Sequence, residues 1–328
     1  MENTNSTKQR KVAVLVGCNY ANTKNELRGC INDVVAMHEI LVQRFGFEEK
    51  NIQVLTDAAE SKVLPTGINI KAALNRMIDE ALPEDVLFFH YSGHGTRIPS
   101  VKPAHPFRSD EAIVPCDFNL ITDVDFREMV NRIPKGASFT MLSDSCHSGG
   151  LIDKEKEQIG PFASIKDNIS PILNSFIQKT IPFDSVLQHL QSLTKINTQD
   201  IGTHLLESFG GNASLKFRLP PPLEMDIFKS LKGDEGILLS GCQANETSAD
   251  IQGGGGKPHG AFTYAVQEAL KDWPIKGLSN REVVMKAREV LKSQGLIEQH
   301  PCLYCSDDNA NAVFLCQSSD QKKASSSL

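Results

Sequence analysis

The sequence DVLFFHYSGHG, residues 85–95, begins with an apolar run and ends with a histidine between two glycines. An apolar run without polar alternation is typical of a strand that is buried on both faces, as in a parallel sheet covered by helices. Ligands of such sheets bind beyond the carboxyl ends of the strands, and His94 follows this strand directly. We therefore expect an α/β protein with reactive side chains at that edge of the sheet.

On both sides of this run, strand-like and helix-like segments alternate, which indicates a mostly parallel central sheet with helices on both faces. Further strands are predicted at residues 11–17, 51–57, 138–150, 236–243 and 311–316. Helices are predicted at residues 31–46, 69–82, 122–134, 260–273 and 280–295. Thr122 or Asp123 is expected to cap the third of these helices.

Composition divides the chain into four parts. Residues 1–150 carry most of the alternating pattern. Residues 151–230 are rich in Ser, Asn, Gln and Lys, which indicates an insertion with some helix, too long for a simple loop. Order returns in residues 231–316, and residues 317–328 are predicted to be a disordered tail.

The whole chain has 328 residues, of which 40% are hydrophobic and 23% charged, as in a globular protein. Its formal net charge of -6 argues against general binding to nucleic acid or to an anionic membrane. No apolar run is long enough to cross a bilayer, and the basic N-terminus leads into a strand without a signal-peptide cleavage site. Scattered cysteines are typical of a reducing compartment, so we expect a cytoplasmic protein, with the nucleus and the apoplast left open.

A second reactive motif, SDSCHSGG at residues 143–150, ends another predicted strand. If the two strands are neighbours, His94 and Cys146 face one another at the same edge of the sheet. An imidazole activates a thiol by taking its proton or by stabilising the thiolate, so this pair predicts nucleophilic catalysis. The backbone N–H groups of Gly95 and Cys146 are candidates for an oxyanion hole, since glycine permits close approach to a substrate.

Other interpretations exist for each residue alone. A single Cys146 is more often a small buried hydrophobe, a single His94 is more often a satisfied core group, and His147 beside the cysteine suggests metal binding. Two glycine-flanked motifs about fifty residues apart are harder to explain in that way, because the catalytic His and Cys of caspases have the same spacing. Cys302 and Cys305 form a C-x-x-C that lacks the second pair of a zinc site.

The motifs HYSGHGT and SDSCHSGG together resemble the catalytic motifs of the metacaspases. Further blocks resemble those of the plant type II members, namely NELRGCINDV, DEAIVPCDFNLITD, GLIDKEKEQIG and LLSGCQANETSAD. The resemblance implies a caspase-like fold with a large-subunit region at residues 1–150, a linker at residues 151–230 and a small-subunit region at residues 231–316. It also implies a monomeric cysteine endopeptidase with a role in programmed cell death or protein processing.

The same resemblance implies protein substrates with Arg or Lys before the cleaved bond, held in an acidic pocket. The matching positions are Cys30, Asp33, Ser92 and Asp144. Carboxylates in a partly desolvated pocket pair with an incoming Arg or Lys and repel Asp, so the chemistry of these residues agrees.

Type II metacaspases resemble zymogens that cut their own linker after a basic residue. The candidate bond here is Lys179–Thr180, in the sequence NSFIQKTIPFDSV, where a polar segment changes to an apolar one. Less favoured alternatives are Lys154, Lys156, Lys166 and Lys195.

Calcium is the point at which this sequence departs from most of that family, whose type II members usually carry an acidic cluster after the His motif. Calcium prefers about six to eight oxygen ligands, several of them carboxylates. Residues 96–109 contain no acid, and only Asp110 and Glu111 follow. We therefore expect no metal site, no cofactor and activity without calcium, and the resemblance suggests an acidic pH optimum.

Three alternatives differ from this interpretation. An enzyme of the same fold with another bond preference would be an Asp-directed caspase, a legumain or a separase, but the nucleophile motif lacks the Q-A-C signature of caspases. A non-enzymatic scaffold would be expected to lose the cysteine, the histidine or the glycines, and all are present. A nucleotide-binding Rossmann protein is disfavoured, because the first strand-to-helix turn has no G-x-G-x-x-G.

Overall fold

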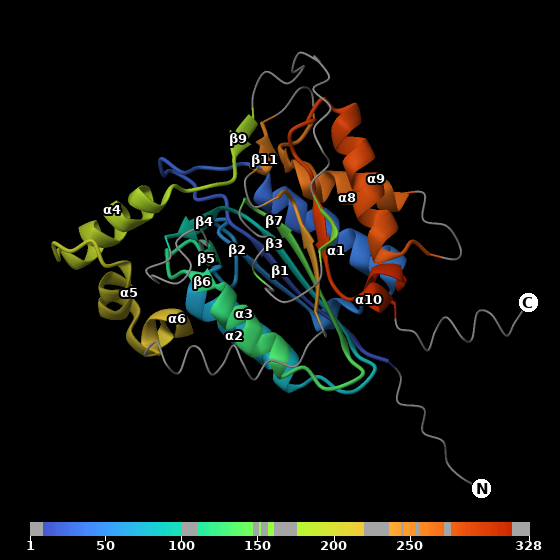
Figure 1. Cartoon of the computed structure of the whole chain (residues 1–328), viewed down its shortest axis with the longest axis horizontal. Coiled ribbons are helices and arrows are strands. Elements are labelled where there is room, and N and C mark those ends of the chain that lie inside the picture. The colour runs from blue at the N-terminus through green and yellow to red at the C-terminus, as the bar shows by residue number, and fades with distance from the viewer. Residues whose placement is uncertain are drawn as a thin grey trace, which may run out of the picture.

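A computed structural model describes residues 9–99, 110–146, 151, 157–160, 176–219, 236–243, 246–252, 256–271 and 277–316. Within these residues, seven strands form the central sheet in the order β2-β1-β3-β7-β10-β13-β8 (Figure 1). They are β1 (Lys11–Gly17), β2 (Ile52–Thr56), β3 (Val86–Ser92), β7 (Ser138–Asp144), β8 (Glu157–Ile159), β10 (Gly236–Ser240) and β13 (Cys302–Tyr304). In this order the pairings from β2 to β10 are parallel, and the last two pairings, β10–β13 and β13–β8, are antiparallel, which confirms the prediction of a mostly parallel sheet.

Helices cover both faces of this sheet (Figure 1). One face carries α1 (Cys30–Phe45), α8 (Ala261–Lys271) and α9 (Asn280–Ser293), and the other carries α2 (Gly67–Asp79) and α3 (Asp123–Asn131). Successive side chains of a strand point to opposite faces, so Phe88 packs in the first core and Phe89 in the second. Because both faces are buried, β3 is apolar on both of its faces over Val86–Phe89, as the run at residues 85–95 predicted.

Two smaller sheets lie beside the main one. The first contains β4 (Gly95–Ile98), β5 (Asp110–Ile113) and β6 (Ile121–Thr122), and the second contains β9 (Phe176–Gln178), β11 (Ala249–Ile251) and β12 (His259–Gly260). Helices α4 (Phe183–Thr194), α5 (Ile201–Phe209) and α6 (Leu215–Arg218) share an apolar cluster with the β4–β6 sheet. The short elements are η1 (Glu49–Asn51), η2 (Gly210–Asn212) and α10 (Asp307–Asn311).

The helix cap predicted at Thr122 or Asp123 is Thr122. Its hydroxyl accepts a hydrogen bond from the backbone of α3, while the Asp125 carboxylate accepts one from the N–H of Thr122 at 2.8 Å, which completes a capping box. None of the described helices is both long and apolar enough to cross a membrane.

The strand predicted at residues 311–316 is wrong. Asn311 ends α10, Val313 makes only an isolated bridge to Ser279, and Leu315 has a φ of 53°, which interrupts an extended chain. Phe314 and Leu315 are buried in the core on the α1 face instead. In the sequence, the last strand of the sheet is β13, which pairs with β10 on one side and with β8 on the other. No edge of β13 is left for residues 311–316, and this apolar run fills the core without joining the sheet.

Candidate active site

Two neighbouring strands carry the reactive residues. Strands β3 and β7 are parallel, and the register aligns their last residues, Ser92 and Asp144. His94 and Cys146 each follow two residues later, so both lie beyond the carboxyl edge of the sheet. This is the edge at which ligands bind in parallel sheets.

His94 is buried and oriented by the first strand-to-helix loop. Its Nε2 lies 2.8 Å from the carbonyl oxygen of Asn25, which can only accept a hydrogen bond, so Nε2 carries the proton. Nδ1 then has a lone pair and has no hydrogen-bond partner among the described residues. Burial lowers the pKa of His94 to about 4, although the carbonyls of Asn25 and Lys179 oppose this shift. The imidazole is therefore a neutral base over most of the pH range.

The Cys146 thiol is fully buried and faces Ser248, which directly precedes β11. Ser248 N–H donates to the sulfur at 3.0 Å, and the sulfur lies 3.6 Å from the Ser248 carbonyl oxygen. Ser248 is positioned in turn by Gln299, whose Nε2 donates to the Ser248 hydroxyl at 3.0 Å. The block that contains Ser248 comes from another part of the chain, so its place beside the thiol depends on the pairing of β10 with β7.

The carbonyl oxygen of Lys179 accepts two hydrogen bonds at this edge. The backbone N–H of Gly95 donates at 3.1 Å and the backbone N–H of Cys146 at 3.2 Å. A side chain at position 95 would overlap the carbonyl oxygen of Cys146, so only glycine fits here. The two amides predicted as an oxyanion hole thus converge on one carbonyl, and that carbonyl belongs to the bond predicted for self-cleavage.

The side chain of Lys179 is fully buried between two aspartates. Its Nζ lies 3.2 Å from Asp144 Oδ1, 3.4 Å from Asp33 Oδ2 and 2.9 Å from the Ser92 hydroxyl. Cys30, the fourth residue predicted for the pocket, is also fully buried. Burial alone would lower the pKa of Lys179, but the Asp144 and Asp33 carboxylates outweigh it and raise that pKa. The four positions inferred from the resemblance therefore surround one ammonium group.

The two aspartates differ in charge state. Burial raises the pKa of Asp33 to about 6, although the Lys179 ammonium opposes this shift. Burial acts in the same direction on Asp144, but there the Lys179 ammonium and hydrogen bonds from Ser248 and Thr263 outweigh it, and the pKa of Asp144 is lowered. We assign the lasting negative charge to Asp144, because it accepts short bonds from the Ser248 hydroxyl (2.6 Å) and the Thr263 N–H (2.8 Å) as well as facing the ammonium.

Three residues that contribute to this site were missed in the sequence. Besides Ser248, Gly260 closes the pocket, because a side chain there would overlap the Lys179 ammonium and both carboxylates. Asp250 is buried beside the pocket, where it accepts hydrogen bonds from the backbone N–H of Arg28 at 2.9 Å and of Gly29 at 3.0 Å. The block LLSGCQANETSAD contains Ser248 and Asp250, but residue type and spacing alone did not distinguish them there.

Other predicted positions lie away from this arrangement or outside the described residues. Lys195 is exposed at the end of α4. Outside the described residues lie Lys154, Lys156, Lys166, His147 and residues 100–109, the basic loop that follows the His motif. Among the residues that are described, no group of three metal-ligating side chains occurs, and Asp110 forms an ion pair with Lys216 at 2.5 Å.

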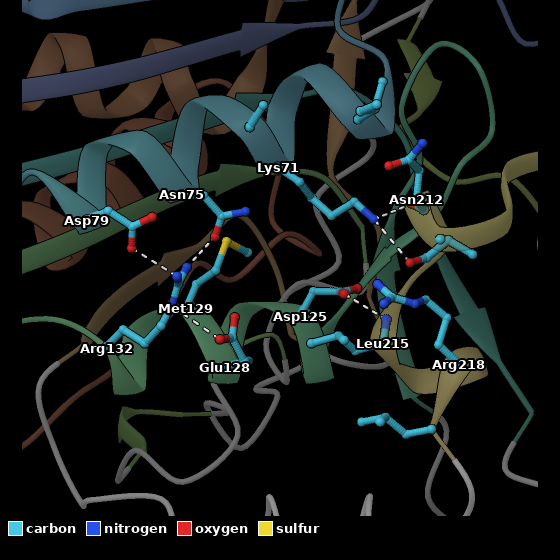
Figure 2. Close-up of a pocket in the computed structure, with 15 residues that line it drawn as sticks. Lys71, Asn75, Asp79, Asp125, Glu128, Met129, Arg132, Asn212, Leu215 and Arg218 are labelled. Atoms are coloured by element: carbon cyan, nitrogen blue, oxygen red, sulfur yellow. Dashed lines mark hydrogen bonds and ion pairs between the residues drawn. The ribbon is translucent and has the colours of Figure 1, made fainter.

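A cavity of about 630 Å³ lies elsewhere, between α2, α3 and α6 (Figure 2). Its polar lining is already internally paired, as Arg132 bonds to Asp79 at 2.9 Å and Leu215 N–H donates to Asp125 at 2.9 Å. None of the residues around Lys179 lines this cavity. The cavity lies where α6 packs near α2 and α3, the helices on one face of the main sheet.

Comparison with known proteins agrees with this geometry. Residues 11–155 match the family model of the metacaspase peptidase C14 domain. Metacaspase-9 of Arabidopsis thaliana is 62% identical, over 94% of this chain and 98% of that protein, and Metacaspase-6 of the same plant is 37% identical, over 93% and 100%. The crystal structure of protein GSU0716 from Geobacter sulfurreducens has a TM-score of 0.57 and 18% identity, covers 94% of this chain and 99% of that one, and shares the fold alone.

Proposed function

Because the chain belongs to the metacaspase family of cysteine peptidases, as its motifs predicted, we propose that it is an endopeptidase that cleaves after Arg or Lys and first cuts itself after Lys179. The observation that carries this proposal is the pose of Lys179. Its ammonium meets Asp33 and Asp144 while its carbonyl oxygen meets the amides of Gly95 and Cys146. That is the pose a substrate requires, with the charge recognised on one side and the scissile carbonyl polarised on the other.

The proposed reaction uses His94 and Cys146 in turn. His94 Nδ1 takes the thiol proton, and the sulfur attacks the Lys179 carbonyl carbon while Gly95 and Cys146 N–H groups stabilise the oxyanion. The C–N bond breaks, His94 returns the proton to the leaving amine of Thr180, and a thioester on Cys146 remains. Water then attacks the thioester, which frees the Lys179 carboxylate and restores the thiol.

The residues before the cleaved bond support a substrate specificity that depends only on the charge of the basic residue at that bond. Strand β9 pairs with β11 as an added antiparallel strand, so the main chain of Phe176, Ile177 and Gln178 is held by backbone hydrogen bonds. Their side chains are exposed, whereas Lys179 is fully buried. We therefore propose that the enzyme accepts varied residues upstream and selects the basic residue at the cleaved bond.

Self-cleavage gives the first test. The wild-type chain is expected to yield two fragments, the second beginning at Thr180, and Lys179→Ala to remain intact, because alanine offers no charge to the two aspartates. Lys179→Arg should still be cut, since the guanidinium keeps the charge. Mass spectrometry of the fragments measures this, with the exposed Lys195→Ala as the matched control. A fragment that begins elsewhere, or cutting of Lys179→Ala at the wild-type rate, would reject the site.

Calcium and pH give the second test. We propose activity without calcium, which is supported by the ion pair that occupies Asp110, and activity at acidic pH, which is supported by the lowered pKa of His94. The imidazole is a base above its pKa of about 4, so kcat should persist to about pH 5. Below the pKa of Asp33, about 6, that carboxylate takes up a proton, so KM for basic reporters should rise.

The measurement is hydrolysis of a Lys-ended reporter in excess chelator across a pH series. Retained turnover in chelator, with kcat falling only as His94 becomes protonated, is the expected result. Loss of turnover in chelator at every pH, with recovery in millimolar calcium, would show that the basic loop had been misinterpreted.

A further inference from the structure

The chain is held very differently on the two sides of the Lys179–Thr180 bond. Before the bond, Phe176 is 44% exposed and Ile177 39%, and the segment depends on one short strand pairing and the Lys179 pocket. After the bond, Ile181 is 1% exposed and belongs to the apolar cluster of α4, α5 and the β4–β6 sheet. Cutting the bond therefore frees the first side far more readily than the second.

The backbone at the cut is also fixed by Gly95. Gly95 N–H donates to the carbonyl of Lys179 at 3.1 Å, and Ile181 N–H donates to the carbonyl of Gly95 at 3.0 Å. Thr180 lies between these two bonds and forms a bridge with Gly95. The second bond does not involve Lys179, so it remains after cleavage and holds the new N-terminus next to the amides of the oxyanion hole.

The segment that follows is held by contacts at several points between Val186 and Leu215. In α4, Val186, Leu187 and Leu190 are buried, and the His189 ring stacks on Phe118 with centroids 3.9 Å apart. Farther on, the N–H of Leu215 donates to Asp125 at 2.9 Å and Lys71 Nζ donates to the carbonyl of Ala213 at 3.3 Å (Figure 2). A chain fixed at so many points keeps Thr180 in place when its bond to Lys179 is gone.

We infer that the α-amino group of Thr180 in the cut chain is an acyl acceptor, so that the enzyme joins Lys- or Arg-ended peptides to its own new N-terminus. This inference rests on the proposed function, which supplies the thioester on Cys146. The Thr180 amine attacks the thioester carbonyl, the new C–N bond forms as the C–S bond breaks, and the amine proton passes through His94 to the sulfur. The reaction needs no reactant besides the donor peptide.

The tethered amine competes with water because of its position and its basicity. A group held against its reaction partner acts at an effective concentration far above that of a free reagent. Only the neutral amine is a nucleophile, and an α-amino group has a pKa of about 7.7–8.0. Hydrolysis should therefore dominate at acidic pH, and transfer to Thr180 should increase toward pH 8.

The experiment uses the self-cleaved full chain and a short peptide ester that ends in Lys, because an ester delivers an acyl group without a competing amine. Denaturing intact-mass spectrometry then follows the fragment that begins at Thr180. The expected result is a gain equal to the acyl mass, stable to hydroxylamine as an amide is and a thioester is not. The ratio of adduct to hydrolysed donor should increase roughly 30- to 50-fold between pH 6 and pH 8, as the neutral fraction of the amine does.

Two variants test whether the burial of Ile181 holds Thr180 in place. Ile181→Asp should lower the ratio of adduct to hydrolysed donor about tenfold or more, because the charge disrupts the burial that holds Thr180. Leu193→Asp is the matched control on α4, the helix that follows Ile181, since Leu193 is 53% exposed, and it should leave the ratio unchanged. Self-cleaved chain whose Cys146 thiol is alkylated before the donor is added should give no adduct; Cys146→Ala cannot serve here, because it would not release the Thr180 amine.

The wild-type measurement decides the inference even if Ile181→Asp fails to fold. Hydrolysis of the donor that depends on Cys146, with no amide adduct on Thr180 at any pH, overturns the inference and leaves the proposed function intact. An adduct that is equally abundant when the Cys146 thiol of the cut chain has been alkylated also overturns it. Absence of both self-cleavage and donor hydrolysis rejects the proposed function and the inference together.

Discussion

Cys146→Ala is expected to lower kcat/KM for Lys- and Arg-ended reporter peptides by on the order of 10⁴-fold or more, with the fold intact. The Cys146 sulfur accepts a hydrogen bond from the Ser248 N–H, and the backbone N–H of Cys146, together with that of Gly95, polarises the Lys179 carbonyl. No other described thiol has this position. Removing it removes the covalent step, and the oxyanion hole alone gives little turnover.

His94→Ala should have an effect of similar size, because the thiol then loses the base that takes its proton. The two losses should not add, since the residues act as one unit, and the double variant should be about as slow as either single one. Cys305→Ala is the matched control. That thiol is also fully buried, but it directly follows β13 and packs in the core on the α1 face. Near wild-type hydrolysis by Cys146→Ala would disprove the assignment.

Asp144→Asn is expected to remove the preference for basic residues, at a cost of about 2–5 kcal/mol in transition-state binding. That corresponds to a fall in kcat/KM of roughly 30-fold to several thousandfold for Lys-ended reporters. The reason is the charge state: Asp144 keeps a lowered pKa and lies 3.2 Å from the Lys179 ammonium, so asparagine leaves a buried cation without its main counter-charge.

Asp33→Asn should cost less, and its effect should depend on pH. The pKa of Asp33 is about 6, so the wild-type carboxylate is charged above that value and mostly protonated well below it. The variant and the wild type should therefore differ at neutral pH and converge near pH 5. Kinetics with Lys- and Ala-ended reporters at both pH values measure this.

Asp123→Asn provides the control for these two variants. Asp123 is a buried carboxylate paired with Arg127 at 3.1 Å, and burial raises its pKa to about 6 also, but it lies on α3 outside the pocket. It should change stability without changing the preference for Lys over Ala. A wild-type enzyme that prefers Asp-ended peptides would contradict the pocket altogether.

Sequence patterns predicted most of the central sheet but not its far edge. The runs that became β1, β3 and β10 are mostly apolar because both of their faces are covered, and the burial of whole strands is visible in their residue types. The run at residues 311–316 is apolar as well, but it is not a strand. Apolar residues occur wherever the core is filled, so an apolar run alone does not show that a segment joins the sheet. Short polar edge strands such as β8 leave no comparable trace.

The sequence by itself determined the family and predicted the reactive residues: two glycine-flanked motifs with a histidine and a cysteine are specific enough to be interpreted without coordinates. Only the tertiary structure decided what surrounds them. Ser248 and Gly260 are common residue types from a distant block, and they reach Lys179 because β10 pairs with β7 and because α8 begins beside Asp33. The convergence of Lys179 on Gly95, Cys146 and two aspartates joins residues that are far apart in the chain. Local spacing encodes local chemistry, whereas such long-range contacts arise from the packing of the whole core.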